Sequence, residues 1–165
     1  MKTTTKIASY FVFALLGMLL ITHSPAAEYA SIEGVESTDA VFDFRIGDPE
    51  TALAHFGLIH DMIKDPNMRV NDTQPEIIIV FVGPSVKLVS TESEFEAGKQ
   101  KHLGAVADKI SEMSDDGIRF VICMTAAHVF DIDPDTILPE VDKVRNGWIT
   151  LIGYQQQGYA MIANF

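Results

Sequence analysis

The hydrophobic residues divide the chain after residue 40 into alternating strand-like and helix-like segments. Residues 77–82, Ile-Ile-Ile-Val-Phe-Val, are apolar at every position. A strand of this kind is covered on both faces and is typical of the middle of a sheet between helices. Residues 118–122 form a second short apolar run. In the later part of residues 41–46, apolar and polar residues alternate, which predicts a third strand.

The segments between these strands have apolar residues at spacings of three and four, which predicts helices. The first runs from Pro49 to about residue 64, with Asp48 placed as its N-cap. Residues 95–113 predict the longest helix, and residues 124–130 a short one. A last helix over residues 148–155 is followed by Gly158, which suits a helix C-terminus.

Two weaker strands, residues 141–144 and 159–163, bring the number of strands to five. Strands that alternate with helical segments predict an α/β fold, here a three-layer sandwich with a mostly parallel five-stranded sheet. We expect this domain to span residues 40–165. Residues 27–39 are polar and acidic without a clear period, so we expect a linker or an N-terminal arm there.

The N-terminus has the layout of a secretory signal peptide over residues 1–26. Lys2 and Lys6 precede an apolar run, and Ser24-Pro25-Ala26 supplies a helix breaker and small residues. The alternative is a membrane anchor, but the apolar run is shorter than the roughly 20 residues that a spanning helix needs. We therefore expect an exported protein, periplasmic or secreted, with no membrane association after cleavage.

The chain is acidic, with a formal net charge of −11. Cleavage after Ala26 would remove two lysines and leave 10 basic against 23 acidic residues, a net charge of −13. Such a surface repels nucleic-acid phosphates and anionic membranes, so neither is expected as a partner.

Cys123 is the only cysteine, so the domain cannot contain an internal disulfide. In an open parallel sheet, ligands bind beyond the carboxyl ends of the strands, and three segments leave predicted strands at that edge: residues 47–49, 83–85 and 123–125. Cys123 would also begin a helix, where the helix dipole favours thiolate over thiol. The alternative is that Cys123 packs in the core, as free cysteines often do.

The histidines point to no particular site. His55 and His60 are five residues apart, which does not match the spacing that brings two ligands to one helix face. His128 could assist the thiol if the chain folded it back toward Cys123, but covering the surface is the more ordinary role. The sequence has no Gly-rich phosphate fingerprint, no CxxC pair and no HExxH motif, so we expect neither a metal nor a cofactor.

Five segments in order resemble the DsrE/DsrF-like proteins, in particular their small exported members. They are "VFDFRIGDPETALAHF", "IIIVFVGPSVKLV", "DDGIRFVICMTA", "DTILPEV" and "VRNGWITLIGYQQQGYAMI". The resemblance implies an α/β fold that assembles into homo-oligomers, trimers or hexamers. In the sulfur-relay branches of that family, a cysteine at the position of Cys123 accepts sulfur as a persulfide and passes it on.

Two functions follow as hypotheses. The first is a sulfur-handling thiol protein, a carrier rather than a hydrolase or an oxidoreductase, in which Cys123 accepts sulfane sulfur from a donor and passes it to an acceptor protein. The second is a non-catalytic oligomeric module that binds a small ligand or a protein, with Cys123 as core packing. Trp148, Tyr154 and Tyr159 surround the terminal helix and would either line an interface or complete the core.

Overall fold

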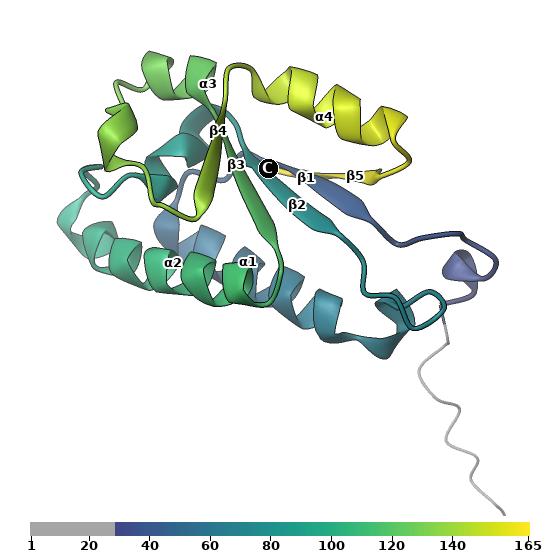
Figure 1. Ribbon diagram of the computed structural model, residues 1–165. Helices are drawn as coiled ribbons and strands as arrows, with labels where there is room; N and C mark the ends of the chain where they lie inside the picture. Colours follow the sequence, from purple (N-terminus) through teal and green to yellow (C-terminus); the bar gives the residue numbers. More distant parts are fainter. Residues whose placement is uncertain (1–28) are drawn as a thin grey trace, which may run out of the picture. The chain divides into compact units, whose positions relative to one another are not determined.

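Five parallel strands form one sheet in the part of the chain that the structure describes. The structure is a computed structural model that describes residues 29–165, so the predicted signal peptide, residues 1–26, lies outside it. The strand order is β4-β3-β2-β1-β5, and every neighbouring pair is parallel (Figure 1). The strands are β1 (Ala40–Phe44), β2 (Ile77–Phe81), β3 (Arg119–Cys123), β4 (Val141–Val144) and β5 (Ala160–Asn164).

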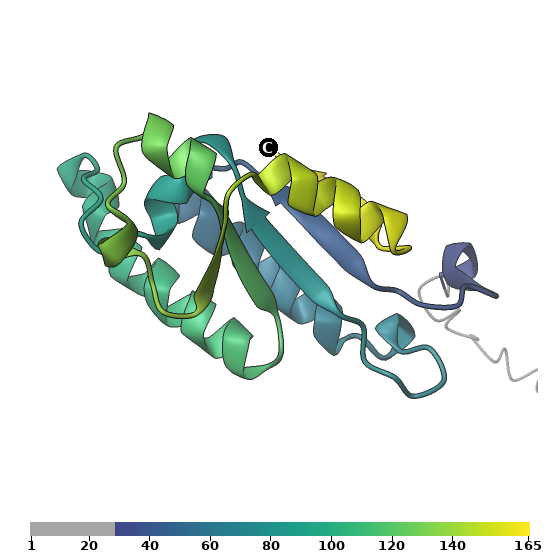
Figure 2. The ribbon, with the colours of Figure 1, turned by 45° about the horizontal axis from the view of Figure 1, so that its top comes forward.

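Helices cover both faces of this sheet within the unit formed by Ser31–Phe165. The helices are α1 (Pro49–Lys64), α2 (Ala97–Asp115), α3 (Met124–Val129) and α4 (Gly147–Gln156). Helices α1 and α2 lie on one face and α4 lies on the other, while α3 continues directly from the end of β3 (Figures 1 and 2). The predicted three-layer α/β sandwich is therefore confirmed, and its sheet is parallel throughout.

Short 3-10 segments connect these elements: η1 (Ala30–Ile32), η2 (Pro66–Met68), η3 (Gly83–Val89) and η4 (Pro134–Thr136). The predicted helix start at Asp48 is confirmed, because its side chain accepts a hydrogen bond from the Thr51 amide at 3.0 Å. Segment η3 was not predicted, because its valines and leucine lack a regular period. Within residues 29–165 no helix combines the length and the apolarity that crossing a membrane requires.

The alternation along the strands separates two hydrophobic cores. The larger core lies against α1 and α2 and is centred on four stacked or edge-on aromatic rings, those of Phe44, Phe56, Phe81 and Phe120. The smaller core lies against α4 and contains Val41, Ile78, Val80, Val82, Val121, Cys123 and Leu151. Tyr154 and Tyr159 pack against this smaller core, whereas Trp148 is 60% exposed and does not complete it.

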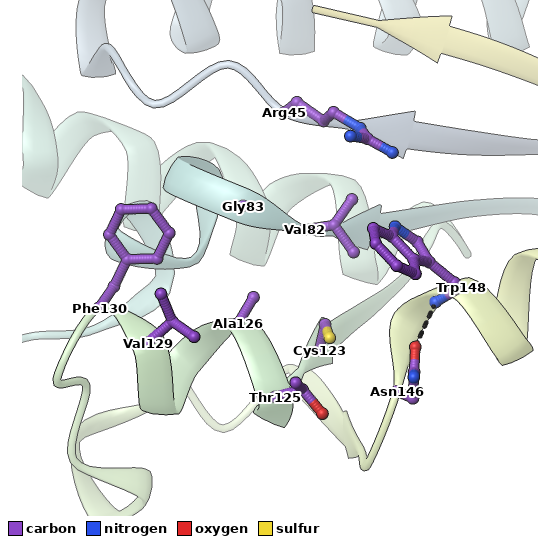
Figure 3. A pocket seen from close by; sticks show the side chains of 10 residues that line it. All are labelled: Arg45, Val82, Gly83, Cys123, Thr125, Ala126, Val129, Phe130, Asn146 and Trp148. Atoms are coloured by element: carbon purple, nitrogen blue, oxygen red, sulfur yellow. Dashed lines mark hydrogen bonds between the residues drawn. The ribbon is translucent and has the colours of Figure 1, made fainter.

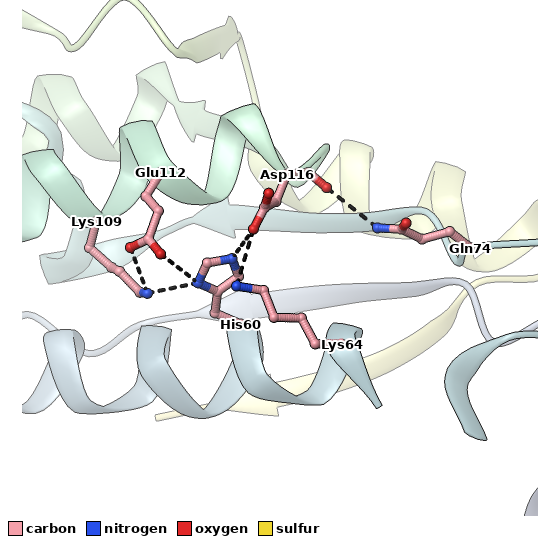
Figure 4. A network of polar contacts seen from close by, with 6 residues as sticks. All are labelled: His60, Lys64, Gln74, Lys109, Glu112 and Asp116. Atoms are coloured by element: carbon pink, nitrogen blue, oxygen red, sulfur yellow. Dashed lines mark hydrogen bonds and ion pairs between the residues drawn. The ribbon is translucent and has the colours of Figure 1, made fainter. Parts of the chain in front are cut away.

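A polar network joins α1 to α2 at the edge of the larger core (Figure 4). His60 is buried, and its Nε2 lies 2.6 Å from Asp116 Oδ2 while its Nδ1 lies 2.7 Å from Lys109 Nζ. Because a lysine ammonium can only donate, we infer that Nδ1 accepts from Lys109 and that Nε2 donates to Asp116. Lys64 also pairs with Asp116, at 3.2 Å. The histidine thus serves as a connection between helices.

Candidate functional site

A cavity opens at the carboxyl end of the sheet. Its volume is about 270 Å³, and it lies where parallel α/β sheets commonly bind ligands (Figure 3). The residues that line it come from four different strand ends: Arg45, Val82, Gly83, Cys123, Thr125, Ala126, Val129, Phe130, Asn146 and Trp148.

The parallel pairing of β1, β2 and β3 places the three predicted segments at one edge of the sheet. Gly83 and Cys123 line the cavity as expected, whereas after β1 the lining residue is Arg45 and not residues 47–49. A fourth contribution, Asn146 and Trp148 from the segment after β4, was missed. The β4 strand is short, and its sequence alone does not show that its end returns to the cysteine.

The end of β2 is held in place by a buried hydroxyl. Ser85 Oγ donates to the carbonyl oxygen of Phe44 at 2.7 Å and approaches that of Val82 at 3.0 Å. Gly83 has a φ of 62°, a left-handed conformation that glycine adopts without steric cost. These features turn the chain sharply after β2 and leave space for the cavity.

Cys123 is 5% exposed, yet it is among the residues that line the cavity. Its neighbour across the sheet face is Gly147, the first residue of α4. A Cβ atom at Gly147 would lie 2.9 Å from Cys123 Cβ and 2.7 Å from Val82 Cγ1, both too close for normal contact. Only glycine therefore allows the N-terminus of α4, the positive end of the helix dipole, to pack against the cysteine.

Hydrogen bonds fix the two segments that flank Cys123. The amide and the Oγ1 of Thr125 both donate to the carbonyl oxygen of Arg145, at 3.1 and 2.7 Å. Asn146 caps α4, since its Oδ1 accepts from the Trp148 amide at 3.0 Å. The start of α3 and the start of α4 are thereby tied together on either side of the thiol.

Arg45 is the only charged residue among those that line the cavity. Its Nε and Nη2 donate to the Asp43 carboxylate at 3.0 and 2.9 Å, and Asp43 is 6% exposed. The hydrogen bonds that Arg45 donates to Asp43 raise the pKa of Arg45, so the guanidinium stays charged. Asp43 interrupts the apolar positions of a buried strand, and this sequence signal marks the ion pair but does not show that Arg45 lines the cavity.

His128 does not reach the cavity. It lies near the end of α3, is exposed, and is not among the lining residues. Residues 29–165 contain no group of three His, Cys, Asp or Glu side chains that could hold a metal ion. The groups available at the cavity are the Cys123 thiol, the Arg45 guanidinium, the polar side chains of Thr125 and Asn146, and an apolar wall.

Sequence comparison gives the family of this chain. The DsrE/DsrF-like family matches residues 18–163. The chain belongs to the DsrE/DsrF-like family. A search of curated protein sequences gives no match.

Two solved structures of similar fold support the architecture of this family member. One is a protein of unknown function, MTH1491 from Methanobacterium thermoautotrophicum, with 21% identity, a TM-score of 0.60, and coverage of 77% of this chain and 99% of that chain. The other is the ychN protein from E. coli, with 8% identity, a TM-score of 0.53, and coverage of 78% and 99%. At these identities the likeness extends to the fold alone.

Proposed function

We propose that this DsrE/DsrF-like protein is a sulfur carrier whose acceptor atom is the sulfur of Cys123. The thiolate attacks the outer sulfur of a donor persulfide, so that Cys–S⁻ and R–S–SH give Cys–S–SH and R–S⁻. The new S–S bond replaces the one that breaks, and the donor leaves as a thiolate. A second thiolate, from an acceptor, then takes the outer sulfur and regenerates Cys123.

The observation that carries this proposal is the position of Cys123 at the cavity beside the first residue of α4. Positive potential favours a thiolate, and the N-terminus of α4 lies close to Cys123 because residue 147 is glycine. The cavity admits a small donor to a residue that is otherwise buried. Membership of the DsrE/DsrF-like family adds support for sulfur chemistry of this general kind.

One observation favours a second function, a binding module in which Cys123 only packs. The cysteine is 5% exposed, and it belongs to the smaller hydrophobic core. In that case the cavity binds a ligand without covalent chemistry.

Alkylation separates the two functions. Because the chain has one cysteine, incorporation of iodoacetamide reports Cys123 without any mutation. The carrier proposal expects modification of the folded protein, at a rate that rises with pH as the thiolate forms. Modification that begins only when the protein unfolds would favour the binding module.

We also propose that the protein is exported and assembles with copies of itself. The export proposal rests on the signal-like layout of residues 1–26, and mass spectrometry of the protein from its host should give a start at Ala27 or within two residues of it. Self-assembly is supported by apolar side chains that the described chain leaves exposed on α4 and β5. These are Ile149, Ile152, Met161 and Ile162.

A further inference from the structure

The ion pair between Asp43 and Arg45 is not explained by a contribution to folding stability alone. Asp43 lies on the face of the sheet that α4 covers, in line with Val41 and across from Val80. Asp43 is buried while Arg45 is partly exposed, and a partly buried ion pair of this kind contributes little stability. The pair therefore calls for a role other than holding the fold together.

The ion pair holds the Arg45 side chain in place but does not use all of its hydrogen-bond donors. Asp43 takes up its Nε and Nη2, and the guanidinium carbon lies 5.5 Å from the centre of the Phe165 ring. No hydrogen bond within residues 29–165 uses Nη1, and the side chain remains 37% exposed. A guanidinium held in this way can donate to a second anionic group without first losing conformational freedom.

The remainder of the cavity is predominantly apolar, with Val82, Val129, Phe130 and Trp148 along its wall. Its volume of about 270 Å³ lies near the lower end for small-molecule sites. The chain as a whole has a net charge of −11, so an anion needs a local cation to enter. An occupant that matches all three properties is small, has an apolar body, and carries one anionic group.

We infer that Arg45 is a specificity-determining residue, and that the sulfur donor is a small organic persulfide with one anionic group that accepts hydrogen bonds from Arg45. The sulfur part of this inference rests on the proposed function of Cys123. The recognition part does not, because it concerns what the cavity binds.

The binding preference can be measured without any thiol chemistry. Trp148 is the only tryptophan of the chain and lines the cavity, so its fluorescence reports ligands there. We would titrate butanoate and butanamide, which have nearly the same shape and differ in charge. The expected result is that butanoate binds about tenfold more tightly, as expected for a charge-assisted hydrogen bond at a partly exposed group.

Two double variants make the test specific. Asp43→Asn with Arg45→Gln removes both charges of the pair without leaving a buried charge alone, and it should abolish the preference for butanoate. Arg119→Gln with Asp142→Asn removes an ion pair of 3.7 Å. Arg119 is the first residue of β3, at the end of the strand away from Cys123, so this variant should keep the preference for butanoate. Both variants conserve the net charge of the chain.

Several outcomes would overturn the inference: equal binding of the two ligands by the unmodified protein, no binding of butanoate, or a preference that survives in the Asp43/Arg45 variant. The alkylation of Cys123 is read separately. A charge preference together with an unreactive Cys123 would refute sulfur transfer while supporting anion recognition by Arg45, and a reactive Cys123 without a preference would do the reverse.

Discussion

At the scale of single residues, the site depends on the contact between Gly147 and Cys123. The first residue of α4 approaches the end of β3 so closely that no side chain fits between them. This contact places the N-terminus of α4 beside Cys123, which belongs to the smaller core. Both the packing of the smaller core and the position of α4 beside Cys123 therefore require glycine at residue 147.

Replacement of Gly147 by alanine should disturb both properties. The added methyl group must displace Val82 or Cys123, and overpacking of this kind costs about 1–3 kcal/mol of folding free energy. We expect a lower urea midpoint and a changed rate of Cys123 alkylation in the folded protein.

Gly153 provides the matched control, because it lies in the same helix and a Cβ atom there meets nothing within 4 Å. Gly153→Ala should leave alkylation unchanged and stabilise the protein by up to about 1 kcal/mol. If the two variants behaved alike, close packing at Gly147 would not explain the environment of Cys123.

At the scale of elements, the positions of the strands follow from the apolar pattern, whereas the composition of the cavity does not. Strands β2 and β3 are apolar on both faces, so their central place in the sheet could be predicted from the sequence. Cys123 could be placed at the carboxyl edge for the same reason, since it ends one of these strands.

The contributions of Arg45, Asn146 and Trp148 could not be predicted in this way. Arg45 lies in a segment that was interpreted only by its alternating apolar residues. Asn146 and Trp148 reach the cavity because β4 pairs with β3 and α4 then crosses the opposite face of the sheet. The position of the segment after β4 depends on the pairing of β4 with β3, which the local periodicity of the sequence does not reveal.

The layer formed by α1 and α2 should lose stability in acid. A hydrogen bond from His60 lowers the pKa of Asp116, and one from Lys109 lowers the pKa of Glu112. Carboxylates with a lowered folded-state pKa stabilise the protein above their unfolded pKa of about 4, and this stabilisation is lost as the pH falls through the folded values. We therefore expect the urea midpoint to drop below about pH 4.

Asp116→Asn tests the cause of this drop. The variant should be less stable than the unmodified protein at pH 5.5, and the difference should shrink at pH values below about 3. A difference that stays constant over this range would show that Asp116 does not take part in the acid response.

At the scale of the whole molecule, the described domain leaves apolar side chains exposed on α4 and on the edge strand β5. Ile149 and Ile152 on α4 are 68% and 59% exposed, and β5 is an edge strand with mostly exposed residues. An edge strand next to exposed apolar residues favours association with another chain. This surface is our candidate for the homo-oligomer interface.

Light scattering should give a trimer, a hexamer or at least a dimer for the unmodified protein. Ile149→Lys with Ile152→Lys should shift the protein toward the monomer, because it places two charges in the interface. Leu58→Lys, at an equally exposed position on α1, should leave the assembly intact. A monomer for the unmodified protein at about tens of micromolar would contradict self-assembly.

The central claim is that Cys123 accepts sulfane sulfur, and intact-mass measurement tests it most directly. The folded protein would be incubated with a small organic persulfide, freed of excess reagent, and weighed beside the Cys123→Ser variant. Our account predicts that the unmodified protein gains the mass of one sulfur atom, that the variant gains none, and that an added acceptor thiol removes the extra sulfur. An unmodified protein of unchanged mass, with Cys123 open to modification only after denaturation, would contradict it.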